Sequence, residues 1–164
     1  MKTNLEGIKL IKEFESLHDG DLTLIGLQPK MDPIGIWTEG YGRAMRDKKG
    51  NFIKGIANKK LAYDNITIKT IAEAEKALIQ DLSPREEIVS QNIKIPLTTN
   101  QFSALVSYVY NTGGSSTLYR LINNKASDKE IRTWFETKYI TADGKILPGL
   151  IRRRKAEADL YFKK

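Results

Sequence analysis

The hydrophobic positions near the start of the chain recur at helical spacing and predict an amphipathic helix over residues 3–17. Ile8, Ile11 and Phe14 form this apolar stripe, and Leu10 and Leu17 flank it. At about 100° per residue, Glu15 falls on this apolar stripe, whereas Glu13 falls on the opposite face. We therefore expect Glu13 to be solvated and Glu15 to point to the interior or to the edge of a cleft.

The pattern changes over residues 18–56, where short β-prone runs alternate with turn residues. The runs are 22–27, 36–41 and 51–56, and turn signals such as Asp19-Gly20 and Asp32-Pro33 separate them. This predicts a small antiparallel sheet or irregular hairpin lobe, too small to be stable without support from helices.

The rest of the chain predicts helices over 67–91, 98–110, 117–124, 128–139 and 149–162. Thr70 and Glu73 match a capping box, and Pro84 predicts a kink or a restart. Thr98 or Thr99 can cap the most apolar helix, which the segment 111–114 (NTGG) ends. We predict one α+β domain over 1–164, with a β-rich lobe at 18–66. Residues 1–17 and 67–164 form the helical lobe and a long connecting helix, with a cleft between the lobes.

Composition narrows the functional classes. The chain has 27 Lys+Arg against 20 Asp+Glu, a formal charge of +7, which favours an anionic partner such as a wall polymer, a nucleic acid or a membrane surface. It has no cysteine and one histidine, which excludes a cysteine nucleophile and disfavours zinc sites built on Cys or paired His. Charges interrupt the first residues too often for a signal peptide or a membrane span.

Two carboxylates stand out as a candidate pair for glycoside cleavage. That reaction needs an acid for the leaving oxygen and a carboxylate that acts as base or nucleophile, normally from different elements. Glu15 at a helix end and Asp32 in the following turn region fit this demand. A partly buried Glu15 would hold its proton more strongly, as a general acid requires. Taken singly, each could also be structural: Glu15 an ion-paired helix end, Asp32 a turn starter and Thr38 a strand filler.

The sequence as a whole resembles the phage-type lysozymes, the glycoside hydrolase family of endolysins that cut peptidoglycan. The matching segments are 10–15 (LIKEFE), 32–38 (DPIGIWT), 40–42 (GYG), 101–111 (QFSALVSYVYN) and 148–157 (PGLIRRRKAE). They follow the family's order over nearly the whole chain. The resemblance implies a lysozyme-like fold and a muramidase that hydrolyses the β-1,4 bond between N-acetylmuramic acid and N-acetylglucosamine.

The resemblance also implies the site residues. Glu15 corresponds to the catalytic acid, Asp32 to the carboxylate that orients or activates water, and Thr38 to the third active-site residue, in an inverting displacement by water. Substrate-binding positions are Tyr41, Tyr110 and Arg153, the last being a basic residue expected near the acid.

The chain departs from the family pattern in three places. The segment between Glu15 and Asp32 is roughly twice the usual length, an insertion near 18–31 that could reshape one wall of the cleft. Glu39 replaces the usual Ile after the catalytic Thr, and either faces solvent or tunes the site. Arg43 stands where many relatives have His.

Two alternatives to the enzyme remain open at this point: a glycan-binding protein of the same fold without catalysis, and a nucleic-acid-binding helical protein based on the basic run 152–155. For the enzyme we expect no cofactor, no metal, no nucleic acid and no stable membrane insertion. We expect a monomer, made in the cytoplasm, that reaches the peptidoglycan strand through a separate pore or secretion system.

Overall fold

A computed structural model describes all residues, 1–164, and divides the chain into two compact units. The helical unit comprises Met1–Phe14 and Leu82–Lys164, and the β unit comprises Glu15–Asp81. The sequence placed the lobe boundaries at 17/18 and 66/67. The units differ from this because the last residue of the first helix and the first half of the long third helix belong to the β unit.

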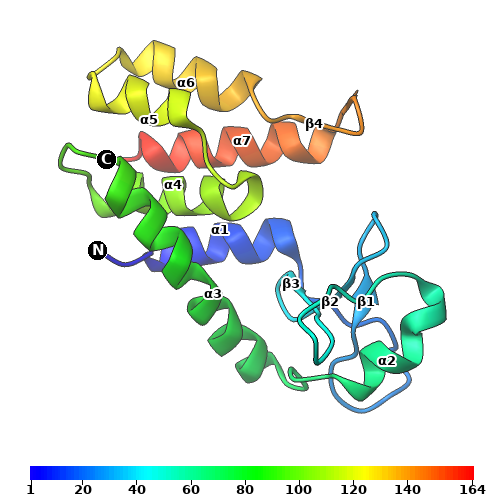
Figure 1. Cartoon of the computed structure of the whole chain (residues 1–164). Helices are drawn as coiled ribbons and strands as arrows, with labels where there is room; N and C mark the ends of the chain where they lie inside the picture. The colour runs from blue at the N-terminus through cyan, green and yellow to red at the C-terminus, as the bar shows by residue number, and fades with distance from the viewer. The chain divides into compact units, whose positions relative to one another are not determined.

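The longer helices are α1, α3, α4, α5, α6 and α7 (Figure 1). Their bounds are Leu5–Glu15, Ile71–Asn92, Thr99–Thr112, Ser116–Asn123, Asp128–Thr137 and Pro148–Tyr161. In the helical unit α4 is the central element, buried from Phe102 to Val109, and it packs on α7, which in turn packs on α6. The α+β class with a small antiparallel sheet agrees with the prediction.

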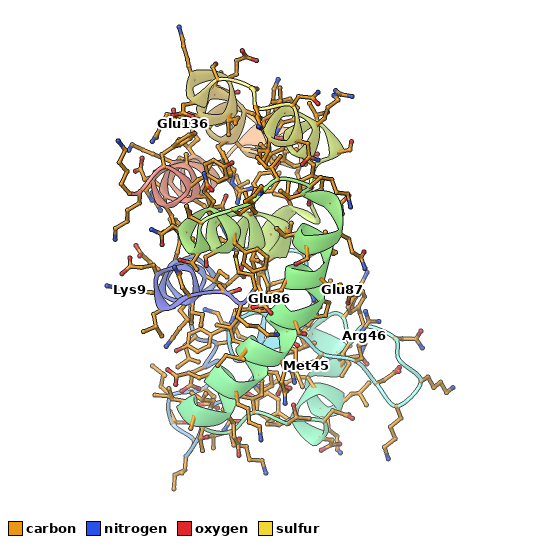
Figure 2. The ribbon with its side chains drawn as sticks, turned by 90° about the vertical axis from the view of Figure 1, so that its left-hand side faces the viewer. Lys9, Met45, Arg46, Glu86, Glu87 and Glu136 are labelled. Carbon is orange, nitrogen blue, oxygen red and sulfur yellow. The ribbon has the colours of Figure 1, made fainter.

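Helix α1 is buried along a stripe displaced slightly from the predicted one. Gly7, Leu10 and Ile11 are buried, whereas Ile8 and Phe14 are half-buried. Gly7 lies so close to Ser103 that a Cβ atom there would be 2.6 Å from the Ser103 Cβ. On the exposed face Lys9 projects away from the ribbon (Figure 2). The close approach at Gly7 rotates the buried stripe, because a residue without a side chain can lie deepest.

Helix α3 begins later than predicted and runs through its proline without interruption. The Thr70 hydroxyl accepts a hydrogen bond from the Glu73 backbone N–H at 3.1 Å, which caps the helix, while Glu73 accepts from Lys69 N. Pro84 lies inside the helix, so the prediction of a restart was wrong. Farther along, Glu86 is buried and accepts hydrogen bonds from Thr3 N and Thr3 Oγ1, both at 2.8 Å.

Both ends of helix α4 are confirmed as predicted. Thr98 and Gln101 form a reciprocal capping box, and Gly113 closes the helix in the left-handed conformation with φ 82°.

The β unit holds a three-stranded antiparallel sheet in the order β1-β2-β3 (Figure 1). The strands are short: β1 Lys30–Met31, β2 Trp37–Glu39 and β3 Arg43–Ala44. Residues 51–56 contribute only isolated bridges, at Phe52 and Lys54. The strand expected at 22–27 was wrong, because these residues form turns and bends. The 3-10 helix at Ile56–Asn58 and helix α2 at Lys59–Asp64 were not predicted.

Two small apolar clusters support the sheet of the β unit. One contains Trp37, Met45, Ile53 and Ala62. The other contains Leu27, Ile68, Ala74 and Ala77, with Leu17 and Tyr41 packed against it. Since Ala74 and Ala77 belong to α3, this helix supplies the support that so small a sheet needs.

A turn at Asp143-Gly144 joins two short strands that were not predicted, β4 (Thr141–Ala142) and β5 (Lys145–Ile146). No helix of this chain combines the length and the apolar character required to cross a bilayer.

Candidate active site

Glu15 and Asp32 line one hollow of about 390 Å³ within the β unit. The other lining residues are Ser16, Leu17, His18, Asp19, Lys30, Met31 and Pro33. The two carboxylates come from different elements, a helix end and a turn after a strand, as glycoside cleavage requires. The hollow therefore contains the pair of groups that the sequence singled out.

Glu15 is the last residue of α1, and the chain changes direction immediately after it. Ser16 has a positive φ of 62°, a conformation that costs energy for a residue other than glycine. The backbone N–H of His18 then donates to the Gly40 carbonyl at 2.8 Å. Glu15 is half-buried and Glu13 is exposed, as the helical phase predicts. The turn at Ser16 and the bond to Gly40 fix the end of the helix that carries the Glu15 carboxyl.

Asp32 is held in one orientation by its own turn. Its Oδ1 accepts hydrogen bonds from the backbone N–H groups of Ile34 at 3.0 Å and Ile36 at 2.9 Å. The backbone adds a bond from Asp32 N to Ile36 O at 2.8 Å and one from Gly35 N to Asp32 O at 3.0 Å. Gly35 has φ 85°, which favours glycine at this position. With Oδ1 occupied, Oδ2 is the oxygen available to a water molecule.

Thr38 lies in the middle of the sheet and is not among the residues that line the hollow. It is 5% exposed, and it pairs with Lys30 of β1 and with Ala44 of β3. Its hydroxyl donates to the Ile36 carbonyl at 3.1 Å. This bond ties Thr38 to the same backbone segment that holds Asp32.

Glu39 corrects one expectation, because it does not face solvent. It is 4% exposed, and its carboxylate accepts from Thr67 N at 3.1 Å and from Ile68 N at 3.3 Å. The Thr67 hydroxyl donates to it as well. Strand alternation failed here because residues on both faces of β2 are covered. Glu39 thus fastens the 67–68 segment to the strand that carries Thr38.

Two further residues of the β unit, Tyr41 and Arg43, contact segments outside the sheet. Tyr41 is half-buried and packs against the cluster around Ile68. Arg43 binds Asp81 through two bonds of 2.9 Å and donates to the Ala77 carbonyl at 3.1 Å. The arginine that replaces the family's usual histidine therefore joins β3 to α3.

Tyr110 and Arg153 belong to the helical unit. Tyr110 is half-buried in α4, and the Arg85 guanidinium lies 5.4 Å from the centre of its ring. Arg153 is 3% exposed, and its guanidinium lies 5.9 Å from the ring centre of Phe14. Neither residue lines the hollow of the β unit.

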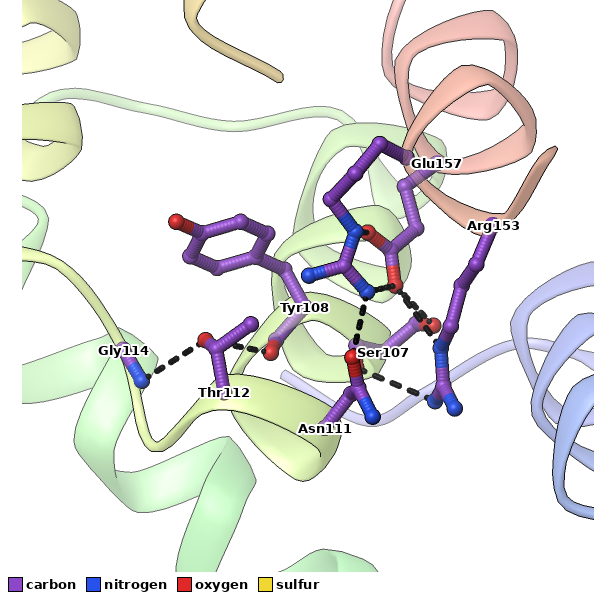
Figure 3. Close-up of polar contacts among 8 residues, drawn as sticks. Ser107, Tyr108, Asn111, Thr112, Gly114, Arg153 and Glu157 are labelled. Carbon is purple, nitrogen blue, oxygen red and sulfur yellow. Dashed lines mark hydrogen bonds and ion pairs between the residues drawn. The ribbon is translucent and has the colours of Figure 1, made fainter. Parts of the chain in front are cut away.

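Arg153 is part of a buried polar network around Glu157 (Figure 3). Arg153 Nε lies 3.2 Å from Glu157 Oε1, and Arg154 Nε lies 2.9 Å from Oε2. Ser107 donates to Oε1 at 2.8 Å, and Arg154 donates to Asn111 Oδ1 at 2.8 Å. Two cations of the basic run 152–155 are therefore buried and paired, so the run is not the exposed patch that nucleic-acid binding would need.

The sequence did not single out His18, Asp19 or Lys30 as site residues. All three line the hollow. The His18 ring also contacts the chain, with Nδ1 3.0 Å from the Gly40 carbonyl oxygen. The signal that could have found them is the extended segment between the two carboxylates, since a longer connection at a site must form part of its wall.

Comparison with known proteins places the chain in a family. The family model described as phage lysozyme matches residues 24–157, which include Asp32, Thr38, Tyr110 and Arg153 but begin after Glu15.

Individual relatives cover the chain more fully. An endolysin of Acyrthosiphon pisum secondary endosymbiont phage 1 is 30% identical over 168 residues, covering 98% of each chain. Among solved structures, the endolysin from Escherichia coli O157:H7 phage FAHEc1 is 30% identical with a TM-score of 0.74, covering 99% of this chain and 94% of that one. The muramidase domain of SpmX from Asticaccaulis excentricus is 27% identical with a TM-score of 0.72, covering 99% of both. The chain belongs to the phage lysozyme family.

Proposed function

We propose that this protein is a muramidase that hydrolyses the β-1,4 bond between N-acetylmuramic acid and N-acetylglucosamine in peptidoglycan. The observation that supports this most strongly is the hollow shared by the Glu15 and Asp32 carboxylates. The family match and the relatives named as endolysins and as a muramidase support the same activity. The protein acts on the bacterial cell wall as a monomer.

In the proposed mechanism Glu15 is the general acid. It donates its proton to the glycosidic oxygen, so that the bond from the anomeric carbon to this oxygen breaks and the leaving sugar departs as a neutral alcohol. A water molecule held by Asp32 Oδ2 attacks the anomeric carbon, and the proton that the water loses passes to Asp32. The result is a single displacement with inversion.

The surroundings of Asp32 suit this role. Two backbone N–H groups hold its Oδ1, so the carboxylate need not reorganise when the water attacks. Thr38 assists by fixing the 36–38 segment through its bond to the Ile36 carbonyl. We assign Tyr41 and Tyr110 to sugar contacts and Arg153 to the electrostatic environment of the acid.

The test of the acid is Glu15→Gln, with Glu13→Gln as the matched control. Both substitutions remove one carboxylate from the same helix, but Glu13 is exposed and outside the hollow. We expect Glu15→Gln to lower the release of reducing ends from purified peptidoglycan by about 1,000-fold, within the range for loss of general acid catalysis. Glu13→Gln keeps wild-type turnover. Equal turnover of the two variants would remove Glu15 from the mechanism.

The test of the water-directing role compares Asp32→Ala with Thr38→Ala. Only Asp32 can carry charge in the transition state, so its loss is expected to cost about 100-fold or more in kcat, against about 10-fold for Thr38. The reverse order would mean that the base is misassigned. Binding of the wild-type protein to peptidoglycan without release of reducing ends would instead support a glycan-binding protein of the same fold.

A further inference from the structure

The loop 21–26, within the segment between the two carboxylates, presents aliphatic side chains to solvent. Leu22 is 85% exposed, Leu24 is 47% exposed and Ile25 is fully exposed at 101%. Single exposed apolar residues are normal, but three large ones within four positions form a concentrated apolar surface.

Hydrogen bonds within the loop hold it in this arrangement. Asp21 Oδ1 accepts from Thr23 N at 3.0 Å and from Thr23 Oγ1 at 2.5 Å, and Leu24 N donates to Asp21 O at 3.2 Å. At the other end Gln28 Nε2 donates to the Ile25 carbonyl at 3.3 Å. The backbone is therefore braced on both sides of the apolar residues, which keeps them directed away from the two clusters of the β unit.

One exposed lysine, Lys69, lies beside this loop, and a second, Lys59, interacts electrostatically with its first residue. The Lys69 carbonyl accepts from Leu27 N at 2.8 Å, and Lys69 lies against Gly26. The pKa of the Asp21 carboxyl is lowered, mainly by the hydrogen bonds from Thr23 and further by the charge of the Lys59 ammonium. Two lysines thus accompany one carboxylate, Asp21, at the loop, in a chain of net charge +7.

We propose that loop 21–26 docks onto the surface of an anionic phospholipid bilayer. Leu22 and Ile25 enter the headgroup region, and Lys59 and Lys69 lie against the lipid phosphates. Shallow burial of a few aliphatic side chains together with lysines is the combination that gives reversible binding to such surfaces. This binding is separate from glycoside cleavage and does not depend on the assignment of Glu15 or Asp32.

The chemistry of the loop favours lipid over other partners. It has no aromatic ring on which a sugar could stack and no arginine, the residue types that dominate protein interfaces. Its three aliphatic side chains also fall far short of the roughly 800 Å² per partner of a stable protein interface. Neither a glycan nor a second copy of the chain is matched as well as a charged bilayer.

The experiment measures co-sedimentation of the full chain with vesicles of phosphatidylglycerol and phosphatidylcholine, and with phosphatidylcholine alone. The test variant is Leu22→Ser/Ile25→Ser. The matched control is Leu5→Ser/Ile146→Ser, which removes two aliphatic side chains that are 84% and 61% exposed in the helical unit. A second test variant, Lys59→Glu/Lys69→Glu, changes only the charge. Circular dichroism and turnover on lipid-free peptidoglycan show that each variant is folded.

We expect the wild type to bind anionic vesicles and the loop variant to bind about 10-fold more weakly, while the control stays within about twofold. The charge variant loses about 10-fold at low salt, and raising the salt weakens the wild type in the same direction. Equal binding by the loop variant and the control, or no binding by the wild type, overturns the proposal. The proposal is also overturned if the loop variant binds vesicles like the wild type and differs from it only in peptidoglycan binding or in self-association.

Discussion

Replacing the buried carboxylate of Glu39 should destabilise the β unit to an extent that can be worked out from its three hydrogen bonds. Glu39→Ala removes the acceptor for Thr67 N, Thr67 Oγ1 and Ile68 N. Thr67 is exposed, so its two donors can turn to water and each lost bond costs about 0.5–1.5 kcal/mol. Ile68 is 3% exposed, so its N–H is left without a partner at a further cost of about 1–3 kcal/mol.

The expected loss in the free energy of unfolding for Glu39→Ala is therefore about 2–6 kcal/mol. For a chain of this length that corresponds to a fall in Tm of roughly 4–24 °C. Glu39→Gln keeps one acceptor oxygen and should lose about half as much.

Thermal and urea unfolding followed by circular dichroism measure this effect, with Glu13→Ala as the control. That substitution also removes one negative charge, but from an exposed site, so it should change the unfolding free energy by less than about 0.5 kcal/mol. Equal Tm values and equal urea midpoints for Glu39→Ala and the Glu13→Ala control would refute the reasoning. They would mean that the three hydrogen bonds make no net contribution to the free energy of unfolding.

Two further predictions concern buried carboxylates of the helical unit. Burial alone would raise the pKa of Glu86, but hydrogen bonds from the N-terminal segment, chiefly from Thr3 N, outweigh it and hold the pKa below its usual 4.5. The Glu86 carboxylate therefore stabilises the fold fully above pH 4.5, and this stabilisation is lost as the pH falls through the lowered pKa. Glu86→Gln should be less stable than wild type at pH 7 in thermal melts, and the difference should shrink as the pH is lowered below 4.5. Glu157→Ala removes the carboxylate that pairs with the buried Arg153 and Arg154 (Figure 3). It should lower the free energy of unfolding, measured in urea, by about 3–5 kcal/mol. If the unfolding free energy of Glu157→Ala lies within about 1 kcal/mol of the wild-type value, the prediction is contradicted. Water would then have replaced the carboxylate as the partner of the two arginines.

Local chemistry explains which parts of the fold could be predicted from the sequence. Thr98 with Gln101 and the glycine at 113 are short-range signals that act within one helical turn, and both ends of α4 follow from them. The run 22–27 is rich in the aliphatic residues that are common in strands, but no strand pairs with it. Its first residues instead form a turn in which Asp21 Oδ1 accepts from Thr23 N. Pairing partners are a property of the folded chain, and residue preferences do not reveal them.

The candidate site was predictable to a similar degree. Helical phase separates Glu15 from Glu13, and the Asp32-Pro33 turn signal places a second carboxylate on another element, so the pair could be proposed before the structure. The burial of Glu39 could not, because it depends on a contact between segments far apart in the chain. For Glu39 the decisive contact is with residues 67 and 68.

The most direct test of the central claim is mass spectrometry of the fragments released from purified peptidoglycan, with reduction of the new chain ends before analysis. A muramidase that uses Glu15 leaves N-acetylmuramic acid at every new reducing end, and these fragments disappear with Glu15→Gln while they persist with Glu13→Gln. New ends at N-acetylglucosamine, free peptides without cut glycan, or the same fragments from Glu15→Gln would contradict the proposed function.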